Sequence, residues 1–172
     1  LLYSSYKRDI NNTIVIVADI FRATTTICVA LENGARSIIP VRSLKEALKY
    51  KEMGFLVGGE RNVKKFDFGD FGNSTYDYIQ EKVKDKDIII STTNGTIAID
   101  EARDSSFLVI GAFANISEIA KYCIWQQKNV VVLCSGWKGK VNMEDTLFAG
   151  AIAEKLSIAG FSTLSDSTQI AL

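Results

Sequence analysis

Apolar and polar residues fall into alternating blocks along this chain, and the blocks predict a regular succession of strands and helices. Continuous β-branched runs such as TIVIVAD at 13–19 and NVVVLCS at 129–135 are typical of strands buried on both faces of a sheet. Longer segments with helical spacing lie between these runs. The first of them covers 23–32 and stops at Asn33-Gly34, a common helix end.

The full pattern predicts an α/β fold. Ser43, with Glu46 three residues later, gives the helix that follows it a capping-box start, and the segment 161–172 reads as the start of a further strand and helix. Strands that alternate with helices need crossover connections, so we expect one mainly parallel sheet with helices on both faces and a single domain over 1–172. The expected strands are 13–19, 36–41, 55–58, 88–91, 107–112 and 129–135, and the expected helices are 23–32, 44–53, 75–83, 95–102, 116–125 and 144–159.

Composition narrows the class of protein. Of the 172 residues, 47% are hydrophobic and 23% charged, and 20 basic side chains balance 20 acidic ones. This balance is ordinary for a globular protein and argues against a general nucleic-acid or membrane-surface binder. No apolar run reaches the length of a membrane-spanning helix. We therefore expect a cytoplasmic protein with no nucleic-acid or membrane partner, and the oligomeric state, including a homo-oligomer, stays open.

The chain contains no histidine, which restricts its chemistry. Ser-His-Asp triads, Cys-His pairs and histidine-ligated zinc are excluded. Three cysteines, an odd number without CxxC spacing, are expected to be free buried thiols. Catalysis would therefore depend on carboxylates, Lys, Arg, hydroxyls, backbone amides or a hard metal ion.

Candidate functional residues follow the predicted strands, where ligands bind in parallel sheets. After the first strand come Asp19, Arg22 and the three threonines 24–26, which open a helix. Arg22 suits phosphate or sulfonate oxygens, and hydroxyls at a helix start form an anion cradle. A threonine cap beside a surface Arg–Asp pair is the alternative interpretation of the same residues.

Later strand ends carry similar residues. Glu60 suits a metal and Arg61 an anion, although a solvated turn would look the same. Asn73 and Ser74 are either helix caps or oxyanion ligands. A second hydroxyl-rich turn, 92–96, precedes the next expected helix.

Glu144 and Asp145 begin the last long helix, where the helix dipole favours carboxylates without any function, but they also suit Mg²⁺. Taken together, these junctions predict a site for a strongly anionic ligand with a divalent metal on one edge of one sheet. Familiar phosphate signatures are absent, because no P-loop, no GxGxxG and no Asp-x-Asp after the first strand occurs.

Several segments in order, DIFRATTT, GGER, FGNST, TTNGT and NMED, resemble the signatures of the 2-phosphosulfolactate phosphatase family. The resemblance spans about 13–170. Thr75 stands where the family commonly has proline, and the family usually extends beyond the point where this chain stops. The resemblance implies Mg²⁺-dependent hydrolysis of 2-phospho-3-sulfolactate to 3-sulfolactate and phosphate, in the route to coenzyme M.

On this basis we expect water to attack phosphorus with help from a bound metal ion, while one carboxylate acts as general base. A covalent route through Asp19 or Cys134 is the alternative, with Cys134 the weaker nucleophile because nothing nearby lowers a thiol pKa. The expected catalytic residues are Asp19, Arg22 and Glu60; the metal ligands Asp19, Glu60, Glu144 and Asp145; and the substrate-binding residues Arg22, Thr24, Thr25, Thr26, Arg61, Asn73, Ser74, Thr93, Asn94, Gly95 and Thr96.

Two other functions compete with this one. A phosphatase for another small phospho-acid, such as a phosphoglycolate- or phospholactate-like compound, would need the same donors without the sulfonate. A non-catalytic anion-binding module would bind phosphate without turnover and would need no group of carboxylates.

Overall fold

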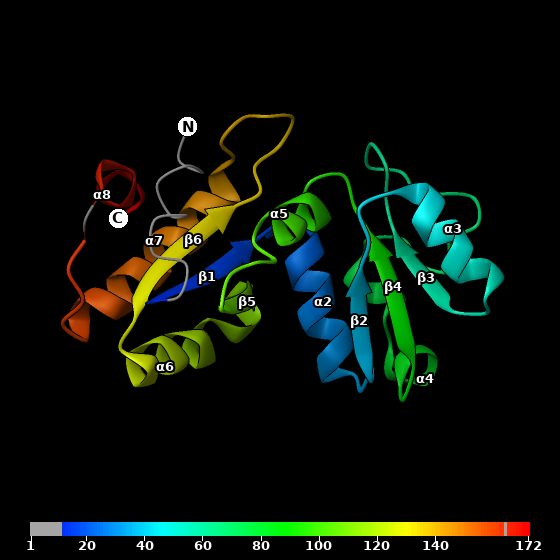
Figure 1. Cartoon of the computed structure of the whole chain (residues 1–172), viewed down its shortest axis with the longest axis horizontal. Helices are drawn as coiled ribbons and strands as arrows, with labels where there is room; N and C mark the ends of the chain where they lie inside the picture. The colour runs from blue at the N-terminus through cyan, green and yellow to red at the C-terminus, as the bar shows by residue number, and fades with distance from the viewer. Residues whose placement is uncertain (1–11, 164) are drawn as a thin grey trace.

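The strands of this protein form two separate parallel sheets. The computed structural model describes residues 12–163 and 165–172. Sheet A has the order β5 (Phe107–Gly111), β1 (Thr13–Ala18), β6 (Asn129–Cys134), and sheet B the order β2 (Ser37–Pro40), β4 (Asp87–Ser91), β3 (Leu56–Gly59) (Figure 1). The predicted α/β class with parallel strands is confirmed. The expectation of one sheet is wrong, because β2, β3 and β4 pair only with one another.

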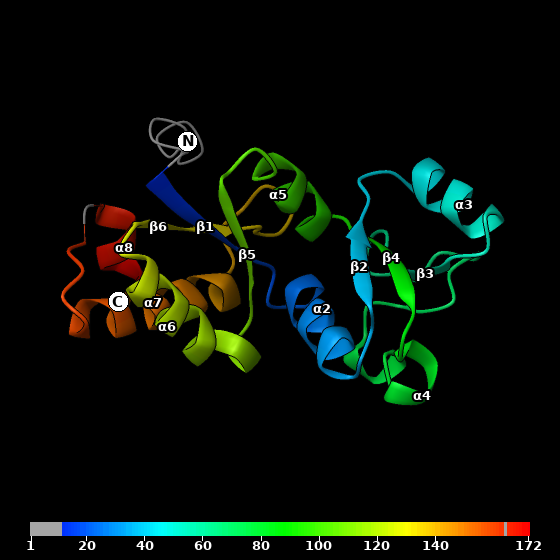
Figure 2. The ribbon, with the colours of Figure 1, turned by 60° about the horizontal axis from the view of Figure 1, so that its bottom comes forward.

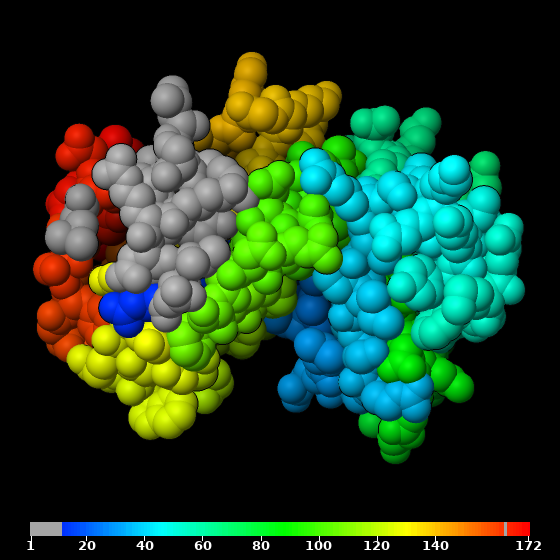
Figure 3. All heavy atoms as spheres, in the orientation of Figure 1, coloured from blue at the N-terminus to red at the C-terminus, as the bar shows by residue number. Residues whose placement is uncertain are grey.

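Two helices lie between the sheets. Helices α2 (Ala23–Glu32) and α5 (Gly95–Glu101) contact both sheet A and sheet B (Figures 1 and 2). One continuous core cluster joins Val15 and Val17 of β1 to Ile27 of α2, Ala98 of α5 and Ile90 of β4. In the space-filling view, α5 fills the front of the region between the two halves (Figure 3). This shared middle layer places the strand ends of both sheets beside the starts of the same two helices.

The outer faces of the sheets are covered by other helices. Ile14 and Ile16 of β1 face away from Val15 and Val17 and therefore away from the middle layer. They pack with Phe148 and Ile152 of α7 (Met143–Ile158) and with α6 (Ile116–Gln126). On sheet B, Ile89 packs outward against α3 (Leu44–Glu52). Both faces of β1 are therefore buried, as its unbroken apolar run predicts.

The expected helix over 75–83 is interrupted. It is divided into a 3₁₀ turn, η2 (Thr75–Asp77), and a short α4 (Gln80–Val83). Tyr78 lies at the break, fully buried, with its ring 4.9 Å from that of Phe71 and its hydroxyl donating to the Gly72 carbonyl at 3.0 Å. A buried tyrosine that must reach this carbonyl outweighs helical propensity.

The remaining elements follow the sequence pattern closely. A 3₁₀ turn, η3 (Phe113–Asn115), precedes α6, and α8 (Asp166–Ala171) follows the final turn. The strand expected in the last segment does not form at 161–163. Among the described residues, none of the helices combines the length and apolar character required to cross a membrane.

Ser43→Ala should destabilise the protein by about 1 kcal/mol, the usual cost of losing a helix N-cap. The Ser43 hydroxyl accepts the Glu46 N–H at 3.1 Å, as the sequence predicts for the start of α3. Chemical denaturation monitored by circular dichroism would measure the loss. Ser43→Asp, which keeps an acceptor, should retain most of the stability; equal losses in both variants would show that the cap contributes nothing.

Candidate functional site

Loops from both sheets meet at the middle layer. Asp19 follows β1 and Ser135 follows β6 in sheet A, whereas Glu60 follows β3 and Thr93 follows β4 in sheet B. The carboxylates of Asp145 and Glu60 both act electrostatically on Asp19, and the Ser135 side chain lowers the pKa of Asp19. The site predicted for one edge of one sheet therefore lies instead at the junction of two sheets.

Asp19 is the centre of this group. Burial, followed by repulsion from Asp145 and then Glu60, raises the pKa of Asp19 from 3.8 to about 6, against the lowering effects of the Ala23 N–H and Ser135. Its Oδ1 accepts the Ala23 N–H at 3.2 Å and its carbonyl accepts the Thr24 N–H at 3.0 Å, so Asp19 caps the start of α2. A carboxyl group with a pKa near neutrality suits proton transfer.

Gly95 allows the start of α5 to approach Asp19 closely. A Cβ added at Gly95 would lie 2.5 Å from the Ala23 Cβ and 2.7 Å from Asp19 Oδ2. These distances are too short for any side chain, so the glycine keeps α2, α5 and the carboxylate in contact. The TTNGT segment therefore contributes to the site through the backbone at Gly95.

Arg22 and the three threonines 24–26 differ in how many hydrogen bonds their side chains form with the protein. Arg22 is exposed, and within the described ranges its side chain has no hydrogen-bond or ion-pair partner. Thr25 and Thr26 donate their hydroxyl protons to the carbonyls of Ile20 and Asn73 at 2.8 and 3.1 Å. Thr24 accepts the Asp19 N–H at 3.0 Å, which leaves its proton free to donate. Arg22 is thus the most available of these anion donors.

Arg61, a predicted anion ligand, instead ties three strand ends of sheet B together. Its guanidinium donates to the carbonyls of Glu60 and Arg42 at 3.1 and 2.8 Å, and to Ser91 Oγ at 2.7 Å. Burial lowers the pKa of Arg61, while Glu60 opposes this effect. A guanidinium held by three protein acceptors is fixed in place and has little capacity left for a substrate.

Glu60 is similarly anchored. Its Oε1 accepts the Thr93 N–H at 2.6 Å, and its Oε2 accepts the Thr93 hydroxyl at 3.0 Å and the Val63 N–H at 2.7 Å. These contacts connect the loops after β3 and β4. They hold the carboxylate where its charge acts on Asp19.

The two acidic residues at the start of α7 have different surroundings. Asp145 is fully buried and accepts bonds from both the β1 and the β6 loops, whereas Glu144 is half-buried and accepts the Asn142 amide at 3.1 Å. Of the predicted acidic group, the structure brings Asp19, Glu60 and Asp145 together. Glu144 faces Asn142 instead.

The other predicted ligands have mainly structural contacts. Thr96 and Thr92 bond reciprocally, with the Thr96 hydroxyl donating to the Thr92 carbonyl at 2.9 Å. Ser74 precedes η2 without a side-chain capping bond. Asn73 and Asn94 retain side-chain capacity, because Asn73 Oδ1 is buried without a partner and Asn94 lines a cavity of about 180 Å³ together with Ser135.

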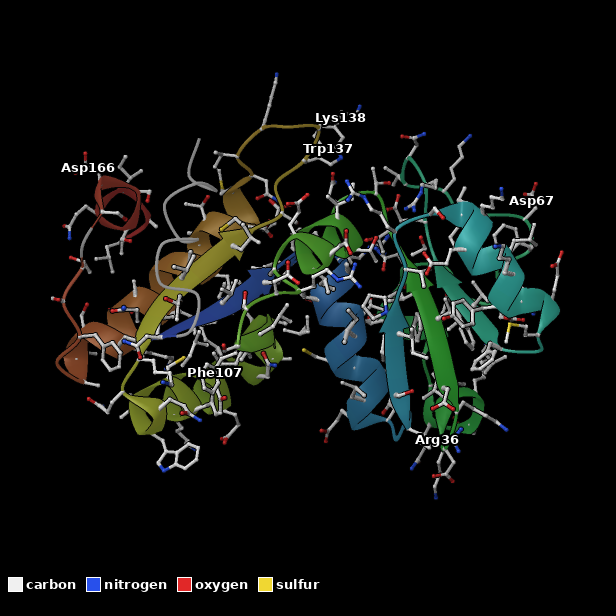
Figure 4. The ribbon with its side chains drawn as sticks, viewed as in Figure 1. Arg36, Asp67, Phe107, Trp137, Lys138 and Asp166 are labelled. Atoms are coloured by element: carbon white, nitrogen blue, oxygen red, sulfur yellow. The ribbon has the colours of Figure 1, made fainter. Side chains whose placement is uncertain are left out.

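Sequence reasoning missed two residues that lie in the site. Ser135 comes directly after β6 and bonds to Asp145, and its place at a strand end was a signal that could have identified it. Asn142, whose Oδ1 is buried without a partner, occupies the N-cap position of α7 without a side-chain capping bond. Trp137 and Lys138 lie on the loop between Ser135 and Asn142, beyond the end of β6 (Figure 4). Arg36, just before β2, lies on the opposite side of the molecule in this view.

Cys134, the alternative nucleophile, is poorly suited to that role. Burial, with a further contribution from the Asp145 carboxylate, raises the pKa of its thiol from 9.0 to about 12. The thiolate is the reactive form, so this environment suppresses reactivity at neutral pH. All three cysteines are free, as expected.

The site fits a hydrated hard cation better than a cage built from protein ligands. In the described part of the chain, no three or more Asp, Glu, Cys or His side chains are grouped to hold a metal by themselves. Mg²⁺ commonly binds through one or two carboxylates, several waters and substrate phosphate oxygens. Asp19 and Glu60 provide such a partial set. The pKa of Asp19 is raised first by burial and then by the neighbouring carboxylates, and a cation would offset the second of these effects.

Comparison with known proteins gives one consistent family. A model of the family described as 2-phosphosulpholactate phosphatase matches residues 3–172. A relative from Caldanaerobacter subterraneus is 41% identical over 90% of this chain and 67% of its own length; another, from Thermotoga petrophila, is 40% identical over 82% of this chain and 61% of its own. Both are named "Probable 2-phosphosulfolactate phosphatase", and this chain spans about two thirds of their length or slightly less. With this match over nearly all of its residues, the chain belongs to the 2-phosphosulfolactate phosphatase family.

Proposed function

We propose that this protein hydrolyses the phosphate ester of 2-phospho-3-sulfolactate, giving 3-sulfolactate and phosphate. The observation that carries the proposal is the placement of two groups near the start of α2: Asp19, whose pKa is raised to about 6, and Arg22, whose guanidinium has no partner among the described residues. One group can take a proton near neutral pH, and the other can bind a phosphoryl oxygen. Family membership supplies the substrate, and a role in forming coenzyme M in the cytoplasm is part of the proposal.

The residues divide the work as follows. Asp19 accepts the proton of the attacking water, and Arg22 binds and orients the phosphoryl oxygens as negative charge builds on them. The Asn94 amide lies at the start of α5 and provides a further donor. Arg61 and Glu60 keep the loops of sheet B fixed around this group.

Mg²⁺ is part of the proposal. Asp19 and Glu60 would hold the ion, and when bound it would neutralise phosphate charge and lower the pKa of a bound water. The partial carboxylate set described above supports this assignment.

The test is phosphate release from 2-phosphosulfolactate, measured with Mg²⁺ and with EDTA. We expect release with Mg²⁺ and none with EDTA. Phospholactate, which lacks the sulfonate, serves as the matched substrate and should be hydrolysed much more slowly. Equal rates with both substrates would point to a more general phospho-acid phosphatase, and phosphate binding without turnover would point to a binding module.

Arg22→Lys should raise the KM for the substrate and lower kcat/KM by about 10- to 100-fold, since a point charge replaces a bidentate donor. Arg22 has no protein partner in the described structure, so thermal stability should stay within about 1 °C of the parent. Arg103→Lys, on an exposed arginine that forms an ion pair with Asp100, is the control and should leave both values unchanged. An unchanged KM for Arg22→Lys would show that Arg22 does not bind the substrate.

A further inference from the structure

The carboxylate of Asp145 joins two loops that are far apart in the sequence. Its Oδ1 accepts the Ile20 N–H at 2.8 Å, and its Oδ2 accepts the Gly136 N–H at 3.1 Å and the Ser135 hydroxyl at 3.3 Å. The side chain is fully buried. Ile20 directly follows Asp19, so one of these bonds fixes the backbone next to the central carboxylate of the site.

Such a buried charge is costly unless donors surround it. Three donors reach Asp145, two of them backbone amides, and each would be left unpaired in a dry environment if the carboxylate were removed. A carboxylate has about four acceptor positions, and three are occupied here by the protein itself. Asp145 is also fully buried, whereas Glu60, which accepts as many bonds, is only half-buried, so Asp145 suits a structural anchor better than the metal ligand expected from the sequence.

We propose that Asp145 is a positioning residue, which holds Asp19 in its working orientation through the Ile20 N–H and couples it to the Ser135–Gly136 loop. The proposal rests on the proposed phosphatase function for its effect on turnover. Its structural part, the fixing of the β1 loop, is independent of any substrate. The two parts can therefore be tested separately.

Asp145→Asn is the decisive variant. An asparagine keeps the shape but presents an NH₂ group to either Ile20 or Gly136, so one of the two amide bonds is lost. We expect kcat to fall about 10- to 100-fold, as for other residues that orient a functional group, while KM and the Mg²⁺ concentration for half-maximal activity stay within about twofold. Glu154→Gln removes an equal charge from the exposed side of the same helix and should change none of these values.

Each other result overturns the proposal. A tenfold or larger rise in the Mg²⁺ requirement, with activity restored by excess Mg²⁺, would make Asp145 a metal ligand. An unchanged kcat per folded molecule, with only a lower melting temperature, would reduce Asp145 to a stabilising residue.

Amide hydrogen exchange at Ile20, followed by NMR, tests the anchoring without reference to activity. The Ile20 and Gly136 amides should both be protected in the parent, and whichever of the two faces the new NH₂ group should exchange at least tenfold faster in Asp145→Asn. If the parent releases no phosphate, the proposed function fails, but this measurement still decides whether Asp145 fixes the loop. If Asp145→Asn does not fold, the parent alone is informative, because a freely exchanging Ile20 amide would contradict the anchoring.

Discussion

Asp19→Asn should lower kcat by at least about 100-fold and, unusually for a buried substitution, should make the protein more stable at neutral pH. The loss of turnover follows from removing the proton acceptor of the site, a contribution that is typically 10²- to 10⁴-fold. The gain in stability follows from the electrostatics of the folded state. There, ionised Asp19 is disfavoured first by burial and then by its acidic neighbours.

The sign of the stability change depends on pH. The folded protein holds the Asp19 proton with a pKa of about 6, against an ordinary value of 3.8, so ionisation costs the folded state about 3 kcal/mol above pH 6. This cost fades as pH falls through the window from 6 to 4. Asp19→Asn should therefore be more stable than the parent by up to about 3 kcal/mol at pH 7 and equal to it near pH 4, in EDTA.

Asp87→Asn is a control that should change stability at neutral pH in the opposite direction from Asp19→Asn. The Arg36 side chain, followed by the Ser37 hydroxyl, lowers the pKa of Asp87 to about 2, so its contribution is present above pH 4 and is lost as pH falls through 2. This variant should be slightly less stable than the parent at pH 7 and fully active, because Asp87 begins β4, away from the site. If Asp19→Asn kept most of its activity, the assignment of Asp19 as proton acceptor would fail.

Gly59→Ala should destabilise the protein by more than about 4 kcal/mol, enough to prevent stable folding in a protein of ordinary stability. Two features of Gly59 cause this. Its φ of 126° is rarely adopted by residues with a side chain, and an added Cβ would overlap the backbone carbonyl of Ser91 on the neighbouring strand. Since the carbonyl belongs to the backbone of β4, it cannot move aside without breaking the pairing of the sheet.

Gly54→Ala separates the two causes. Gly54 also has a positive φ, 89°, but an added Cβ there would meet nothing within 4 Å. Its substitution should cost only about 1 kcal/mol, the usual penalty of the backbone conformation alone. Guanidinium chloride denaturation of both variants would give the comparison. Similar small losses at the two positions would show that β3 and β4 can separate enough to accept a methyl group.

Local structure was largely predictable from the sequence, because it depends on local patterns. The ends of α2 and the Ser43 cap of α3 match the residues that predict them. Strand pairing was not predictable, because hydrophobic runs show that a strand is buried but not which strand lies beside it. The central strands β1 and β4 are buried at every residue except Asp87, but the edge strand β3 is buried except at Leu56, so burial does not identify which strand is central.

The candidate site was predictable in its residue types but not in the partners of those residues. Strand-end reasoning named Asp19, Glu60 and Asp145, whose carboxylates interact in the structure, while the catalytic and metal-binding roles given to them stay predictions. It could not show that the charged side chains of Arg61 and Asp145 form hydrogen bonds with other residues of the protein. Those bonds join segments many residues apart, such as Ile20 and Asp145, and no short motif records them.

The order in which the strands are made differs from the order in which they pair. Strand β1 ends at Ala18, but its partners β5 and β6 begin only at Phe107 and Asn129, whereas all three strands of sheet B lie between Ser37 and Ser91. During synthesis, sheet B can therefore assemble while β1, which is made before it, still lacks both of its partner strands. Long-range pairing of this kind folds slowly and exposes apolar strands meanwhile. We expect the first strand to be the segment that depends most on protection by chaperones in the cell.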